Sequence, residues 1–161
     1  MPRRSGAEFL SQWPKPVPEE PSDSLELFRE LDHVGDLAIE VVACERAELF
    51  RRALCALARL MVEADDIRPT HRHEIVCEAL NDVDLIHDLL ARALNLFFIE
   101  NFVWCSAEVE EQDHKVKATL LGEPFDRARH RLVREIKAVT YHRLVVENDG
   151  SRWRAQIIFD I

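Results

Sequence analysis

The chain ends on the stretch Trp153-Arg154-Ala155-Gln156-Ile157-Ile158-Phe159-Asp160-Ile161, which is rich in bulky and β-branched residues. It follows residues 136–147, where apolar and polar residues interleave as they do in strands. Asn148-Asp149-Gly150-Ser151 separates the two runs, and Asp-Gly favours the positive φ angles of a two-residue hairpin turn. The two runs are therefore predicted to pair as an antiparallel hairpin that reaches the last residues of the chain.

The pairing of this hairpin follows from the position of its turn. If Asp149 and Gly150 form the turn, Val139 lies opposite Asp160, and Lys137 lies diagonal to Asp160 on the same face. A lysine side chain is long enough to reach a carboxylate at that spacing. The other, more apolar face is expected to carry Trp153, Ala155, Ile157, Phe159 and Ile161.

Composition places the chain among ordinary soluble globular proteins. Its 161 residues fit one domain, with 47% hydrophobic and 32% charged residues. The net charge of −9 argues against a wide nucleic-acid groove and favours a basic partner or a metal cation. No apolar run reaches transmembrane length and the start lacks the apolar segment of a secretory signal, so we expect a cytoplasmic protein without membrane contact.

Two parts of the chain differ in composition. Residues 1–24 contain five of the seven prolines and are predicted to be a flexible extension, whereas residues 25–161 are predicted to form the domain. The expected helices, with apolar residues at helical spacing, cover residues 45–62 and 82–99. The expected strands cover residues 26–31, 37–43, 70–80, 102–110 and 115–121, and a turn or short helix at 126–131 precedes the terminal hairpin. This order predicts an α+β fold with two core helices packed on largely antiparallel β-sheet.

Two carboxylates at the end of the chain could serve as metal ligands. The side chain of Asp160 and the terminal carboxylate of Ile161 are hard oxygen donors, which Ca²⁺ and Mg²⁺ prefer. Asp36, in the polar turn after the first strand, is the natural third donor, with Asp32 behind it. His33 in the same turn could be a ligand or a hydrogen-bond partner of one.

Spacing alone favours a simpler interpretation of these residues. Asp36 then caps a turn, and Asp160 forms an ion pair with Lys137. His142 is then a hydrogen-bonded strand histidine and not a catalyst. The sequence contains no Gly-rich phosphate loop and no Ser/His/Asp or Cys/His arrangement, so the residues by themselves indicate an α+β domain with a candidate cation site.

Several stretches resemble the archease family. The run Lys137-Ala138-Val139-Thr140-Tyr141-His142 and the ending Phe159-Asp160-Ile161 match its two C-terminal motifs. Leu31-Asp32-His33-Val34-Gly35-Asp36-Leu37 is similar to its early D-H-T-A-D motif, with valine and glycine in place of threonine and alanine. Gly122-Glu123-Pro124-Phe125-Asp126, continuing to His130, also follows the family pattern. The resemblance covers residues 26–161 and leaves out the proline-rich start.

The resemblance implies a function. Archeases act as accessory proteins of the RtcB-type RNA ligase in tRNA splicing or RNA repair, and promote guanylylation of the ligase histidine from GTP and repeated turnover. The family's divalent-cation site carries over to Asp36, Asp160 and Ile161, with calcium implied and magnesium or manganese open. Lys137 is expected to balance these carboxylates or to touch a phosphate, and Asp32, His33 and His142 to support the site or contact the partner.

Two other classes of function stay open. A metal-dependent hydrolase would need a general base, which only His142 or His33 would supply. A general chaperone or a modulator of RNA-modifying enzymes would bind its partners through apolar surface instead.

Overall fold

The structure is a computed structural model that describes residues 27–161. The predicted extension at residues 1–24 and the expected start of the first strand at residue 26 lie outside the described residues. The elements are β1 (Arg29–Leu31), β2 (Leu37–Ala43), α2 (Arg46–Met61), the short 3-10 helix η1 (Ala64–Asp66), β3 (His71–Glu78), α3 (Asp82–Glu100), β4 (Phe102–Gln112), β5 (Lys115–Pro124), β6 (Ala138–Val139), β7 (Val145–Asn148) and β8 (Trp153–Asp160).

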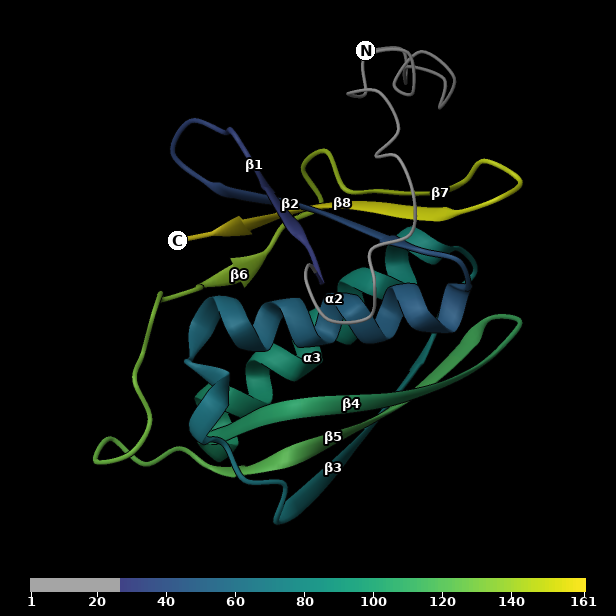
Figure 1. The fold of residues 1–161 in the computed structure, drawn as a ribbon. Helices are drawn as coiled ribbons and strands as arrows, with labels where there is room; N and C mark the ends of the chain where they lie inside the picture. Colours follow the sequence, from purple (N-terminus) through teal and green to yellow (C-terminus); the bar gives the residue numbers. More distant parts are fainter. Residues whose placement is uncertain (1–26) are drawn as a thin grey trace.

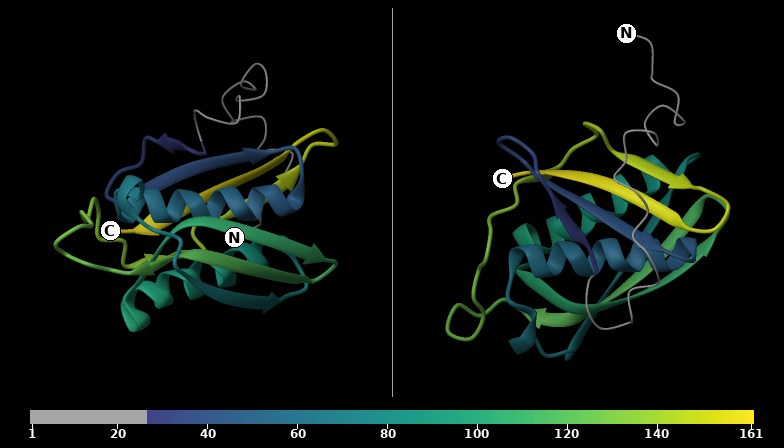
Figure 2. Two further views of the ribbon diagram at one scale, coloured as in Figure 1. Left: turned by 60° about the horizontal axis from the view of Figure 1, so that its bottom comes forward. Right: turned by 45° about the horizontal axis from the view of Figure 1, so that its top comes forward.

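The two helices lie between two antiparallel sheets (Figures 1 and 2). One sheet has the order β1-β2-β8-β6, with β7 pairing the same edge of β8 as β6, and the other has the order β3-β5-β4. Both helices contact both sheets. The predicted α+β class with two core helices is confirmed, and the antiparallel strands are divided between the two sides of the helical layer.

The helices owe their positions to apolar faces and to their caps. In α2 the buried residues cover most of the helix surface, from Leu49 to Met61, because a sheet packs on each side. At the start of α3 the side chain of Asn81 accepts a hydrogen bond from the backbone N–H of Asp84, and Asn101 ends the helix with a φ of 53°. No helix within residues 27–161 is long and apolar enough to cross a membrane.

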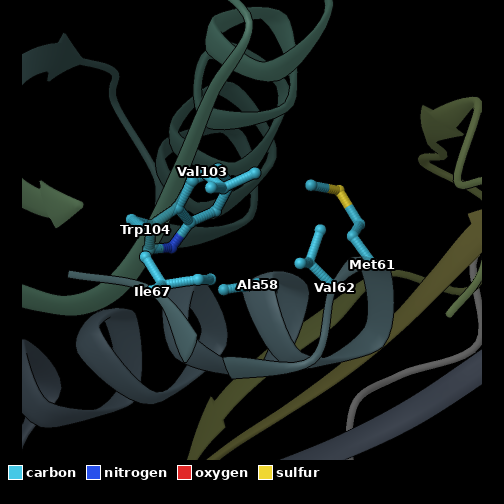
Figure 3. A pocket seen from close by; sticks show the side chains of 6 residues that line it. All are labelled: Ala58, Met61, Val62, Ile67, Val103 and Trp104. Carbon is cyan, nitrogen blue, oxygen red and sulfur yellow. The ribbon is translucent and has the colours of Figure 1, made fainter. Parts of the chain in front are cut away.

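The interior is tightly packed around Trp104. This side chain is fully buried, and its indole Nε1–H donates to the carbonyl oxygen of Leu54 at 3.0 Å, which joins β4 to α2. A small apolar gap beside it leaves no room for a water molecule (Figure 3). The residues that line this gap are Ala58, Met61, Val62, Ile67, Val103 and Trp104.

A bulge in β4 brings its backbone unusually close to β5. The register between these strands shifts between Trp104 and Ser106, and Gly122 pairs with Trp104 at that point. A Cβ atom added to Gly122 would lie 1.9 Å from the carbonyl oxygen of Val103 and 2.6 Å from the Cα of Trp104. Only glycine fits at position 122. Gly122 therefore lets β4 and β5 approach closely beside Glu123.

The terminal hairpin forms, but its predicted register was wrong. Asn148 pairs with Trp153, which leaves a four-residue turn in place of the predicted two. The turn is held by Asp149, whose carboxylate oxygen Oδ1 accepts the backbone N–H groups of Ser151 and Arg152 and the Ser151 hydroxyl. These bonds satisfy more donors than a two-residue turn would, which explains the longer loop.

A second shift in register separates β6 from β7. Ala138 pairs with Asp160 and Val139 with Phe159, because Arg143 adopts a left-handed φ of 51° in a turn that interrupts the predicted long strand. The side chain of Lys137 therefore leaves the sheet on the face opposite to that of Asp160, contrary to the prediction. The expected apolar face of β8 is confirmed for its buried residues Ala155, Ile157 and Phe159.

Candidate functional site

The pairing of β2 with β8 brings two acids together at one end of the five-stranded sheet. Leu37 pairs with Phe159, so the next step of this antiparallel register sets Asp36 opposite Asp160. The β1–β2 turn and the C-terminus lie at the same end of the sheet in Figures 1 and 2. Asp36, Asp160 and the carboxylate of Ile161 are called the acidic tip below.

The turn that carries Asp36 depends on Gly35. Gly35 has a φ of 84°, a conformation that side chains with a Cβ rarely adopt, and no atom lies within 4 Å of a Cβ added there. Val34 beside it is 97% exposed. The two residues that depart from the family's early motif thus form the apex of the turn, while Asp36 directly precedes β2.

Two histidines from separate turns meet beside Asp36. The Nδ1 atom of His33 lies 3.8 Å from Oδ2 of Asp36, beyond hydrogen-bond distance. This Nδ1 is buried and has no hydrogen-bond partner among the described residues. The ring of His142 packs edge-on against that of His33, with 6.4 Å between centroids. His142 is exposed in the turn between β6 and β7, so its expected place on a strand was wrong.

Tyr141, next to His142, is supported by helix α3. The ring of His87 stacks on the Tyr141 ring with 3.7 Å between centroids, and its Nε2–H donates to the carbonyl oxygen of Val139 at 3.1 Å. Partial burial, together with the nearby Asp84, raises the pKa of Tyr141. This contact could not be predicted from the sequence, because His87 is 52 residues away from Val139 along the chain.

The remaining predicted site residues lie around the acidic tip without side-chain contacts to it. Asp32 is exposed in the β1–β2 turn. Lys137 is exposed, and its backbone N–H donates to the carbonyl oxygen of Asp160 at 2.8 Å. Within residues 27–161, no three His, Cys, Asp or Glu side chains are grouped so as to hold a metal ion. Of the three predicted ligands, only Asp36 and Asp160 supply side-chain carboxylates.

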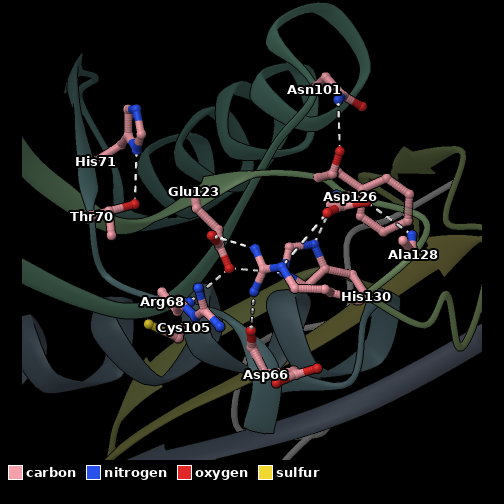
Figure 4. Close-up of polar contacts among 12 residues, drawn as sticks. Asp66, Arg68, Thr70, His71, Asn101, Cys105, Glu123, Asp126, Ala128 and His130 are labelled. Atoms are coloured by element: carbon pink, nitrogen blue, oxygen red, sulfur yellow. Dashed lines mark hydrogen bonds and ion pairs between the residues drawn. The ribbon is translucent and has the colours of Figure 1, made fainter.

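A second polar cluster surrounds Glu123, which is buried at the end of β5 (Figure 4). Its Oε1 accepts the backbone N–H of Arg68 and Nε2–H of His130, each at 2.9 Å. Its Oε2 accepts Nη2–H of Arg129 at 2.6 Å. These donors, above all the Arg129 guanidinium, lower the pKa of Glu123 from 4.5 to about 2.

The buried ring of His130 links this carboxylate to the chain that follows β5. Its Nδ1 accepts the backbone N–H of Asp126 at 2.9 Å, which leaves Nε2 as the protonated nitrogen that donates to Glu123. The sequence placed His130 in a turn, but its partners in the fold could not be identified. All three hydrogen bonds to the Glu123 carboxylate come from groups of this chain. The cluster therefore holds the turn after β5 against the domain.

Comparison with known proteins gives a consistent family. Residues 28–161 match the Archease protein family (MTH1598/TM1083). The chain is 33% identical to the protein archease of Methanopyrus kandleri over 138 residues, which is 83% of this chain and 99% of that protein. It is 30% identical to the protein archease of Pyrococcus abyssi over 136 residues, 81% of this chain and 95% of that protein.

Two solved structures share the fold. The solution structure of Methanobacterium thermoautotrophicum protein 1598 superposes with a TM-score of 0.69 at 22% identity, over 83% of this chain and 98% of that chain. The crystal structure of a Thermotoga maritima archease, described as a possible chaperone, superposes with a TM-score of 0.57 at 22% identity, over 83% and 96%. These matches concern the whole described domain, including both sheets and the helical layer.

Proposed function

This chain belongs to the archease family, and we propose that it is the accessory protein of a cytoplasmic RtcB-type RNA ligase. In this role it promotes transfer of a guanylyl group from GTP to the ligase histidine and so supports repeated turnover in tRNA splicing or RNA repair. It is not itself a catalyst. The observation that supports it best is the register of β2 and β8, which ends at Leu37 and Phe159, the residues next to Asp36 and Asp160.

The acidic tip is proposed to bind a divalent cation. Asp36, Asp160 and the terminal carboxylate of Ile161 offer only oxygen donors, which suits Ca²⁺ and also Mg²⁺ or Mn²⁺. Asp160 is the last residue of β8 and Asp36 directly precedes β2, so both acids adjoin paired strands. When bound, the ion supplies positive charge that offsets these carboxylates and attracts phosphate oxygens.

The groups beside the tip have supporting roles in this proposal. His33, with an unpartnered Nδ1 beside Asp36, is available to donate a hydrogen bond to that carboxylate or to a group of the ligase. His142 packs against it and is exposed to a partner. Lys137 and Asp32 lie outside this contact. Lys137 is proposed to touch a phosphate, and Asp32 to contact the ligase.

The experiment is a guanylylation assay with the purified ligase, radiolabelled GTP and Mn²⁺, with and without this protein. The proposal expects the protein to increase the amount of ligase–GMP formed in repeated cycles. Equal guanylylation in both reactions would contradict it. Release of phosphate from GTP by this protein alone would instead support a metal-dependent hydrolase with His33 or His142 as the general base.

The alternative of a general chaperone makes a different prediction. Such a protein would bind partners through apolar surface, and substitutions in the acidic tip would not change its binding. The test is a pull-down with the immobilised wild type and an immobilised Asp36→Asn variant. If both bind several unrelated RNA-modifying enzymes, this alternative is favoured over the ligase partnership.

A further inference from the structure

The chain between β5 and β6 is basic although the protein as a whole is acidic. Residues 125–137, called the basic segment, contain five arginines and lysines against two acids, while the whole chain has a net charge of −9. The basic side chains of the segment are Arg127, Arg129, Arg131, Arg134 and Lys137. This excess of basic over acidic residues in a segment of an acidic protein favours contact with an anionic partner.

Main-chain hydrogen bonds hold the basic segment against the domain. It begins where the backbone N–H of Phe125 donates to the carbonyl oxygen of Asn101 at 2.7 Å. Farther along, Glu63 donates to the carbonyl of Arg131 at 3.0 Å, and Val133 donates to Met61 at 2.7 Å. The segment ends where the backbone N–H of Lys137 donates to the carbonyl oxygen of Asp160. Figure 1 shows the segment running from β5 in the three-stranded sheet to β6 in the five-stranded sheet. Its surface is therefore fixed, and it leads directly to the acidic tip.

The guanidinium groups of the segment divide into inward and outward ones. Arg129 points inward to Glu123, and Arg134 pairs with Glu30 at 2.7 Å. Arg127 is exposed and forms no ion pair with another residue in the described range 27–161. Arg131 is 78% exposed, and its pair with Glu63 at 3.4 Å is open to solvent. Arg127 and Arg131 are thus available to a partner.

Apolar side chains lie next to these arginines. Leu132 is 44% exposed and Val133 is 49% exposed, although both belong to a segment bonded to the end of α2. Single-stranded RNA is usually bound through aromatic side chains on which bases stack, and the segment has only Phe125, which packs against Phe97 and His130. Arginine is enriched in protein–protein interfaces, and the buried centre of an interface is more apolar than its rim.

We propose that the basic segment is a docking surface for an acidic, partly apolar surface of the partner protein. The inference rests on the function proposed above, because that partner is the RNA ligase. Arg127 and Arg131 would pair with carboxylates of the ligase, and Leu132 and Val133 would fill the apolar centre of the contact. Since the segment ends at Asp160, this contact orients the acidic tip toward the ligase pocket.

The test measures binding of the purified ligase to the wild type and to the double variant R127E/R131E by calorimetry, at about 50 and about 300 mM NaCl, because screening weakens exposed charge pairs. The matched control is K115E/K117E, which makes the same change of charge at the opposite end of β5. We expect the dissociation constant to rise about tenfold or more for R127E/R131E, with a smaller dependence on salt, and to stay within about threefold for the control. Equal melting temperatures of the two variants show that both remain folded.

The outcomes separate this inference from the function on which it rests. If the wild type stimulates guanylylation and R127E/R131E binds the ligase as tightly as the wild type, the docking surface is refuted and the function stands. If the wild type neither binds nor stimulates the ligase, both are refuted. A fluorescent RNA of about ten nucleotides is titrated in parallel, and loss of RNA binding in R127E/R131E with unchanged ligase binding would also refute a protein docking surface.

Discussion

The backbone N–H of Lys137 donates a hydrogen bond of 2.8 Å to the carbonyl oxygen of Asp160. On the other side of β8, the register with β2 fixes the same strand end from Leu37 onward. Asp160 is therefore paired with Ala138 of β6, and the residue before it, Phe159, is paired on both sides. This arrangement makes the acidic tip part of the sheet, so its geometry should be present before a ligand binds.

Calcium should stabilise the wild type through the acidic tip. Binding to the folded state alone adds about 2.7 kcal/mol at a concentration 100 times the dissociation constant, or about 2–4 °C in melting temperature per kcal/mol for a chain of this size. We expect this increase to disappear in Asp36→Asn. Asp113→Asn, in the distant β4–β5 turn where asparagine tolerates the φ of 49°, is the control and should respond like the wild type. An equal response of Asp36→Asn would exclude the tip as the calcium site.

Gly122→Ala should be strongly destabilising. The added Cβ would overlap the carbonyl of Val103, which is backbone and cannot move aside, so we expect a loss of about 2–3 kcal/mol in the free energy of unfolding. Gly150→Ala is the comparison, because it changes only the strain at a φ of 94° in open space and should cost about 1 kcal/mol. Urea denaturation measures both, and a Gly122→Ala variant as stable as Gly150→Ala would show that β4 and β5 are not so close.

Glu123 should make stability depend on pH in the acid range. Its pKa falls from 4.5 in the unfolded chain to about 2 in the fold, so its stabilisation is complete above pH 4.5. That stabilisation is lost as the pH falls from 4.5 toward 2, because the unfolded chain then binds a proton that the folded one does not. Glu123→Gln should be less stable at neutral pH and should lose less stability on acidification.

Urea midpoints at several pH values between 6 and 2 provide the measurement for Glu123. Glu74→Gln is the control, since Glu74 forms only an exposed pair with Lys117 at 3.5 Å. A pH profile of Glu123→Gln that runs parallel to that of the wild type would contradict the assigned role of the Glu123 carboxylate.

Tyr141 is the only tyrosine, so its titration can be followed directly by ultraviolet absorbance. Partial burial and the nearby Asp84 raise its pKa above the ordinary value of 10.0. We expect Asp84→Asn to lower the pKa toward that value, since it removes the negative charge and leaves the burial unchanged. Titration of the wild type at the ordinary value would mean that Tyr141 does not lie partly buried beside Asp84 in solution.

Much of the fold could be predicted because local patterns and the core agree. The apolar spacing of the two helices, the Asn81 cap and the apolar face of β8 each specify the same burial that the structure shows. The opposition of Asp36 and Asp160 was within reach of sequence analysis, because both acids directly adjoin strand ends that pair.

The errors have local physical causes. The register of the terminal hairpin depended on hydrogen bonds to Asp149 that lengthen its turn, and on a left-handed Arg143 that divides the preceding strand. The Glu123 cluster could not be foreseen, because Arg68 donates to it from 55 residues away. Contacts of that kind are set by tertiary packing, which no short pattern encodes.

The central claim concerns the acidic tip, and the most direct measurement is multiple-turnover RNA ligation. A limiting amount of the RtcB-type ligase is supplied with GTP, Mn²⁺ and this protein as wild type, as Asp160→Asn, or with one glycine added after Ile161. The wild type should support many turnovers, whereas Asp160→Asn and the extended chain should leave the ligase near a single turnover, with Asp113→Asn matching the wild type. As many turnovers with Asp160→Asn and with the extended chain as with the wild type would contradict the account.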